Sequence, residues 1–279
     1  MLQNTFCHLP GINLRAERRI WTSGLRHWEQ TESLSADLPK HLAPGLVESV
    51  AESRARLDRR DARYFSEALP SDQMWRMFPE FRDSIAYLDI ETNGLNHQAV
   101  ITTIAVYDGR RVRHYVNGQN LDAIVRDIRE YRMLVTYNGK AFDAPFIERY
   151  FGIRLDMAHL DLMYLLRRLG YTGGLKGCEK KLGIDRGELT DVNGYFAVLL
   201  WQDYLASRND KTLETLLAYN VEDVLNLETL LVKAYNLKLR GTPFENTHCL
   251  PERKTVPNPF QADTGVISRI RHHHRHTWY

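Results

Sequence analysis

The stretch Ile85-Ala86-Tyr87-Leu88-Asp89-Ile90-Glu91-Thr92 predicts a buried β-strand that ends in acidic residues. Because side chains alternate between the two faces of a strand, Asp89 and Glu91 share one face and Ile90 points to the other. Two neighbouring carboxylates repel each other, and a divalent cation with oxygen ligands would relieve that repulsion. The stretch therefore indicates a metal site, although surface strands also end in such pairs.

A third acid follows a second predicted strand. Met133 to Thr136 is expected to form a short buried strand, and 141–151 the helix after it, which ends before Gly152. Asp143 then lies in the first turn of that helix. An acid at this position also stabilises the helix dipole, so Asp143 alone has two interpretations.

The fourth acid lies on a long amphipathic helix predicted from Lys211 to about Leu239. Tyr219 and Asp223 are four residues apart and therefore share one face of that helix. A tyrosine on such a face is also a common core residue, and an aspartate beside it is commonly solvated.

The order of the elements predicts an α/β fold with a mixed central sheet flanked by helices. An Asp108-Gly109 turn joins two strands after the first one, so the sheet begins as a three-strand meander, and helices follow from Asp161 onward. We expect three parts: an N-terminal helical extension (1–83), the α/β domain (84–239) and a loose or docked C-terminal tail (240–279). The prolines and histidines of the tail argue against a packed element there.

Composition bounds the class of protein. The chain has 279 residues, 43% of them hydrophobic and 26% charged, which is typical of a soluble globular protein. Its net charge of +2 excludes the strong basic excess of a dedicated duplex-coating protein. Three widely spaced cysteines without a secretory signal favour the reducing cytoplasm. No apolar run reaches the roughly 20 residues needed to span a bilayer, so no membrane association is expected.

Taken together, the three acidic segments resemble the motifs of the DEDD 3′→5′ exonuclease superfamily. They read Asp-Ile-Glu-Thr, Asn-Gly-x-x-Phe-Asp and Tyr-x-x-x-Asp, and the third identifies the tyrosine subclass, DEDDy. A closer resemblance is to the YprB-type bacterial branch, carried by four further segments: 137–140, 161–162, 174–176 and 223–224. The resemblance implies a ribonuclease H-like fold and hydrolysis of phosphodiester bonds in nucleic acid.

The same resemblance implies a role for each motif residue. Asp89 would bridge two cations, Glu91 and Asp223 would hold the water-bearing one, and Asp143 would support the other through water. Tyr219 would orient the attacking water, since an ordinary tyrosine pKa of about 10 suits a hydrogen-bonding guide better than a base. Mg²⁺ or Mn²⁺ fits such an all-oxygen site. The expected partner is single-stranded nucleic acid, DNA or RNA, or a frayed 3′ end.

Two other functions remain open at this point. A nucleic-acid-binding module on a degraded nuclease fold would be favoured if one of the four acids were replaced, and all four are present. A ribonuclease H-type endonuclease shares the fold and the metals, but the spacing of Tyr219 and Asp223 favours the exonuclease.

Overall fold

The computed structural model describes residues 1–34, 45–96, 98–189, 192–253 and 256–274. Its centre is a five-stranded sheet with the order β3-β2-β1-β4-β5. The strands are β1 (Ile85–Thr92), β2 (Ile101–Tyr107), β3 (Val112–Val116), β4 (Met133–Thr136) and β5 (Ala158–Asp161). The first three form an antiparallel meander, whereas β4 and β5 run parallel to β1. The predicted mixed sheet is confirmed.

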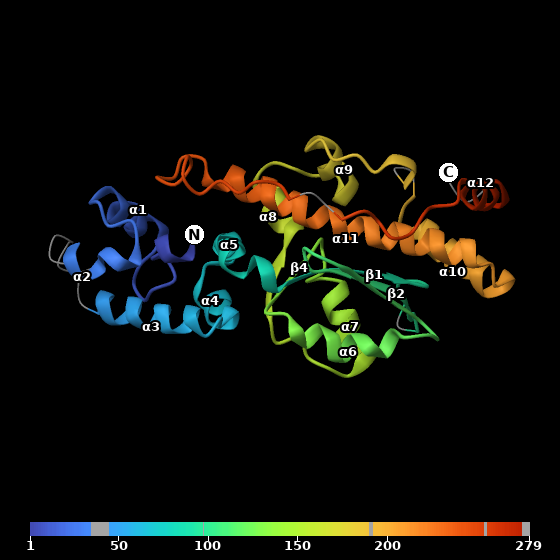
Figure 1. Ribbon diagram of the computed structural model, residues 1–279, viewed down its shortest axis with the longest axis horizontal. Helices are drawn as coiled ribbons and strands as arrows, with labels where there is room; N and C mark the ends of the chain where they lie inside the picture. Colours follow the sequence, from blue (N-terminus) through green and yellow to red (C-terminus); the bar gives the residue numbers. More distant parts are fainter. Residues whose placement is uncertain (35–44, 97, 190–191, 254–255, 275–279) are drawn as a thin grey trace.

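Helices cover both faces of this sheet (Figure 1). One face packs against α11 (Asp210–Leu239), and Tyr87 shares its hydrophobic cluster with Val224 and Leu227 of that helix. The other face packs against α6 (Ile124–Asp127) and α7 (Asp143–Phe151). The alternation of β1 therefore sends Asp89 and Glu91 toward the α11 side.

The N-terminal extension consists of helices, as predicted, and shares the core of the sheet domain. Its helices are α1 (Leu14–Thr22), α2 (Thr31–Leu34), α3 (Leu46–Asp58), α4 (Ala62–Ala68) and α5 (Phe78–Phe81). Tyr235 near the end of α11 contacts the rings of Trp75 and Phe78, with centroid distances of 5.4 and 6.0 Å. One continuous hydrophobic cluster thus joins the extension, α11 and the sheet.

The remaining helices are α8 (Leu162–Arg168), α9 (Gly174–Lys181), α10 (Gly194–Ser207) and α12 (Thr264–His273). α12 corrects the expectation that the tail has no packed element. Asp263 caps this helix. Three apolar side chains of α12 are buried against the α10–α11 pair: Val266, Ile267 and Ile270. Within the part of the chain that the structure describes, no helix is long and apolar enough to cross a membrane.

The buried His8 predicts a pH dependence of stability. It is 5% exposed, and burial, helped by the positive charge of Arg76, lowers its pKa to about 3. The unfolded state, with a histidine pKa near 6.5, then binds more protons below that pH, so stability falls as the pH falls. We expect a loss of about 2 kcal/mol from this group between pH 7 and pH 5.

His8→Phe should remove this part of the acid sensitivity, because the ring keeps its contacts with Trp28 and Phe65 but cannot titrate. The measurement is urea unfolding of both proteins at pH 7 and pH 5. A stability difference between them that stays constant over this range would contradict the assignment.

Candidate metal-binding site

Three carboxylates from two distant segments meet at the interface between the sheet and α11. Asp89 and Glu91 come from β1 and Asp223 from α11, and one oxygen of each lies within 4.8 Å of the others. We call these three residues the acidic cluster. Glu91 and Asp223 are only 8% and 5% exposed.

Burial makes the charges of this cluster unfavourable in the absence of a cation. It raises the pKa of Asp89 to about 7, although a hydrogen bond from Asn220 opposes the shift. Burial also raises the pKa of Glu91 well above its usual range, and the charges of Asp89 and Asp143 add to the effect. A buried all-oxygen donor set with this excess of negative charge fits a hard divalent cation.

Asp143 lies beside the acidic cluster without joining it. It is the first residue of α7, and its Oδ1 accepts a hydrogen bond from the backbone N–H of Ile90 at 3.1 Å. Burial raises its pKa, and the charge of Asp89 raises it further. The structure thus places Asp143 near Asp89, next to the backbone of Ile90 in β1.

The loop that delivers Asp143 depends on its Asn-Gly sequence. Asn138 has a left-handed backbone with φ of 64°, and a Cβ on Gly139 would lie 2.4 Å from Oγ1 of Thr136, so this close approach requires glycine. Asp161 fixes the loop by accepting hydrogen bonds from the N–H groups of Asn138 and Lys140 at 2.8 and 3.0 Å. Asp161 also caps α8, since its carboxylate accepts a hydrogen bond from the backbone N–H of Met163 at 3.0 Å.

Tyr219 lies one helical turn before Asp223 and is 5% exposed. Burial raises its pKa, and the charges of Glu91 and Asp89 raise it further. Its ring also contacts the ammonium group of Lys176, whose Nζ lies 5.2 Å from the ring centroid. Tyr219 therefore keeps its proton at neutral pH and has an O–H group to donate.

Two polar groups at this site were not singled out from the sequence. Asn220 donates to Oδ2 of Asp89 at 2.7 Å and accepts from Oγ1 of Thr103 at 3.0 Å, so it orients the carboxylate from α11. Arg186 forms ion pairs with Asp223 and, at 2.9 Å, with Glu179 of α9. The position of Asn220 directly after Tyr219 was a usable signal, whereas nothing in the spacing of Arg186 indicated this contact.

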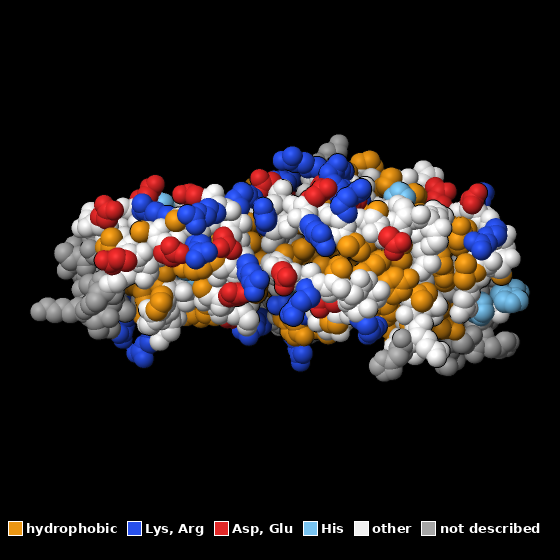
Figure 2. All heavy atoms as spheres, turned by 90° about the horizontal axis from the view of Figure 1, so that it is seen from below, with side chains coloured by type: hydrophobic (Ala, Val, Ile, Leu, Met, Phe, Trp, Pro, Cys, Tyr) orange, Lys and Arg blue, Asp and Glu red, His pale blue; other side chains and the backbone are white. Residues whose placement is uncertain are grey.

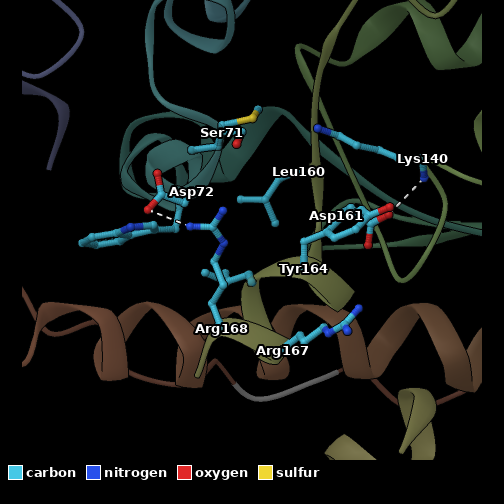
Figure 3. Close-up of a pocket in the computed structure, with 11 residues that line it drawn as sticks. Ser71, Asp72, Lys140, Leu160, Asp161, Tyr164, Arg167 and Arg168 are labelled. Carbon is cyan, nitrogen blue, oxygen red and sulfur yellow. Dashed lines mark hydrogen bonds and ion pairs between the residues drawn. The ribbon is translucent and has the colours of Figure 1, made fainter. Parts of the chain in front are cut away.

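A pocket of about 560 Å³ opens beside the same loop (Figure 3). It lies at the carboxyl end of β5, where Lys140 and Asp161 of the loop region meet Tyr164 and Arg167 of α8. Its opposite wall comes from the N-terminal extension, where Asp72 pairs with Arg168 at 3.0 Å. The pocket shares Lys140 and Asp161 with the loop that leads to Asp143, so it adjoins the segment that carries this acid.

Comparisons with known proteins give one family and two relatives. Residues 86–235 match the family described as the RNase_H superfamily. The uncharacterized protein YprB of Bacillus subtilis (strain 168) is 37% identical over 111 residues, which cover 36% of this chain and 26% of that protein. The family B DNA polymerase structure from the hyperthermophilic archaeon Pyrobaculum calidifontis aligns with a TM-score of 0.44 and 18% identity. That alignment covers 60% of this chain and 27% of the polymerase, so the chain spans about a quarter of the length of either relative.

Proposed function

Because this chain belongs to the RNase H superfamily, whose profile matches residues 86–235, we propose that it is a metal-dependent 3′→5′ exonuclease of the DEDDy type. The observation that carries the proposal is the acidic cluster, in which oxygens of Asp89, Glu91 and Asp223 lie within 4.8 Å of one another in the interior. Buried acids are rarely brought together without a cation or a strong partner. The neighbouring Asp143 and Tyr219 complete the set expected from the motifs.

The cofactor in this proposal is a pair of Mg²⁺ or Mn²⁺ ions, held by Asp89, Glu91 and Asp223 with support from Asp143. Bound cations of this kind polarise the scissile phosphate, lower the pKa of an attacking water and stabilise the departing 3′ oxygen. The chain itself holds the carboxylates in position. Asn220 fixes the orientation of Asp89, and the backbone N–H of Ile90 fixes that of Asp143.

The proposal is tested with purified protein and end-labelled single-stranded DNA and RNA, in the presence of Mg²⁺, Mn²⁺ or a chelator. A 5′-end label should produce a ladder that shortens with time, and the chelator should abolish it. A 3′-end label should appear in mononucleotides from the first time point. Hydrolysis that is unaffected by the chelator would contradict the metal site.

Tyr219→Phe should lower the rate of hydrolysis by about 2- to 10-fold, which is the effect of losing one hydrogen bond of about 0.5–1.5 kcal/mol to a water molecule. The raised pKa of Tyr219 is the reason, because a tyrosine that keeps its proton can position a water but cannot act as a base. Single-turnover rates of the wild type and the variant measure the effect. The loss should be smaller than that caused by substituting Asp89 or Asp223. A loss as large as theirs, together with a lower melting temperature, would identify Tyr219 as a packing residue.

We expect a preference for single-stranded or frayed 3′ ends, with release of mononucleotides. A paired end would have to open first at a cost of a few kcal/mol, and the sequence contains no Gly-x-x-x-x-Gly-Lys loop of a helicase to drive that step. Linear and circular single strands of the same sequence provide the comparison. The circle should remain intact, and efficient cutting of it would favour an endonuclease.

A further inference from the structure

A second concave surface lies at the end of the sheet opposite the acidic cluster. It is a groove of about 820 Å³ between the α3–α4 turn and the segments that lead into β4 and β5. Arg132 and Met157 in its wall directly precede the first residues of these strands. Since β1, β4 and β5 are parallel, the groove lies at their amino ends, whereas Glu91 lies near the carboxyl end of β1.

Arginine dominates the lining of this surface, which we call the arginine groove. Six exposed arginines line it, against two aspartates, Asp61 and Asp156: Arg59, Arg60, Arg63, Arg129, Arg132 and Arg154. The concentration is marked for a chain whose net charge is only +2. Figure 2 shows Lys and Arg side chains gathered over the middle of the molecule, where the N-terminal helices meet the sheet domain.

Half of these arginines have no role in ion pairing within the described residues. Arg60 pairs with Asp83 at 2.6 Å, Arg63 with Glu67 at 2.7 Å, and Arg154 lies 4.0 Å from Asp156. By contrast, Arg59, Arg129 and Arg132 form no ion pair with any residue in the described ranges. Ion pairing among the described residues therefore does not explain why these three cations line the groove.

Arginines that stabilise this fold are buried and paired, unlike those of the arginine groove. Arg76, Arg82 and Arg186 are each at most 7% exposed, and each pairs with a buried carboxylate. The arginine groove has the opposite character, because its cations face solvent across a concave surface. Guanidinium groups in such an arrangement suit phosphate groups, which they bind through paired hydrogen bonds.

Positive charge also continues from the groove toward the acidic cluster. α4 packs along β5, and its first residue, Ala62, lines the groove. Shortly after its last residue, Ser71 lines the pocket of Figure 3, where Lys140, Arg167 and Arg168 lie. The two surfaces are therefore at opposite ends of the α4–β5 pair. A ligand that carries many phosphates can contact both, whereas a single small anion cannot.

We propose that the arginine groove binds the phosphate backbone of a nucleic-acid strand at a site remote from the acidic cluster. This inference rests on the proposed function for the choice of a nucleic acid as the ligand. From Arg132 to the level of Asp89 the strands rise by about 16 Å, at about 3.3 Å per residue. A trinucleotide at the acidic cluster would not reach the groove, since about five stacked nucleotides are needed at roughly 3.4 Å each.

The test measures binding without hydrolysis. The Asp89→Asn protein is titrated, in chelator, into a fluorescent single strand of about 20 nucleotides, long enough for both surfaces. One variant adds Arg59→Gln, Arg129→Gln and Arg132→Gln. A matched control adds Arg15→Gln, Arg19→Gln and Arg208→Gln, which removes the same charge from exposed arginines elsewhere.

The groove variant should bind at least about tenfold more weakly at 0.1 M salt, and the control should bind like its parent. The slope of log K against log salt should fall by about 2, since each lost phosphate contact in a single strand contributes about 0.7. Equal weakening by both variants would overturn the inference, because it would show a general charge effect. Competition by poly-glutamate as strong as that by unlabelled DNA would also overturn it and indicate an acidic protein partner.

Single arginine variants keep the test valid if the triple variant folds poorly, because each should reduce the slope by about 0.7. The outcome is separable from that of the proposed function. If the wild-type protein hydrolyses no strand while groove-dependent binding persists, the exonuclease proposal fails and the groove assignment stands. If hydrolysis is observed and the groove variant binds normally, only the groove assignment fails. Hydrolysis of a trinucleotide should be the same with and without the groove substitutions.

Discussion

Asp89→Asn should reduce hydrolysis by at least about a thousandfold while the protein stays folded. The substitution removes one charge from the acidic cluster at nearly constant shape, and the cation then loses a ligand and part of its attraction. Metal-ion stabilisation of a phosphoryl transition state is worth several kcal/mol, and about 4 kcal/mol corresponds to a factor of about a thousand.

The fold should tolerate this change because Asp89 is part of a repulsive cluster. Asn220 donates to Oδ2 of Asp89 at 2.7 Å, and the amide oxygen of an asparagine can accept the same hydrogen bond. In metal-free buffer the variant should be at least as stable as the wild type, since one of three clustered charges is gone. Added Mg²⁺ should raise the melting temperature of the wild type but not that of Asp89→Asn, which reports metal binding independently of activity.

Glu222→Gln provides the matched control. Glu222 precedes Asp223 on α11 but lies outside the acidic cluster, and its carboxylate accepts from Asn226 and Asn258 at 3.3 and 3.4 Å. The control should retain near wild-type hydrolysis and the thermal shift with Mg²⁺. Wild-type turnover by a well-folded Asp89→Asn protein would refute the two-metal assignment.

Asp223→Asn should abolish hydrolysis to a similar extent but also destabilise the metal-free protein by about 2 kcal/mol. The difference from Asp89→Asn comes from Arg186, whose side chain is 3% exposed and pairs with Asp223. Leaving a buried polar group without its partner costs about 1–3 kcal/mol, and the neutral amide of the variant cannot balance the charge of the guanidinium. Glu179 still pairs with Arg186 at 2.9 Å, which limits the loss.

A double-mutant cycle in chelator separates these contributions. We compare Asp223→Asn, Arg186→Met and the double variant by urea unfolding and expect a coupling energy of about 1–3 kcal/mol. A coupling energy near zero would show that the ion pair does not stabilise the metal-free fold. Hydrolysis should remain absent in the double variant even where its stability recovers, because the metal ligand is still missing.

The sequence identified the elements with strong local patterns. The strand that carries Asp89 and the helix that carries Tyr219 were predicted within one or two residues, because their apolar side chains repeat with clear periods. β5 was missed for the opposite reason. It has four residues, Ala158–Asp161, and is held in place by its parallel pairing with β4, which no local pattern encodes. α12 was not predicted, because the prolines and histidines of the tail argued against a packed element and the helix has only a short row of apolar residues.

For the site, the sequence by itself identified the acidic residues and showed which of them share a strand or a helix. Spacing alone put Asp89 with Glu91 and Tyr219 with Asp223, since the periods of strands and helices are fixed by backbone geometry. Only the tertiary structure decided which side chains from other segments contact these acids. Arg186 reaches Asp223 from the segment after α9, and Arg129 lines the same groove as the distant Arg59, because folding brings these segments to one place. Such contacts depend on packing between elements, and no period along the chain records them.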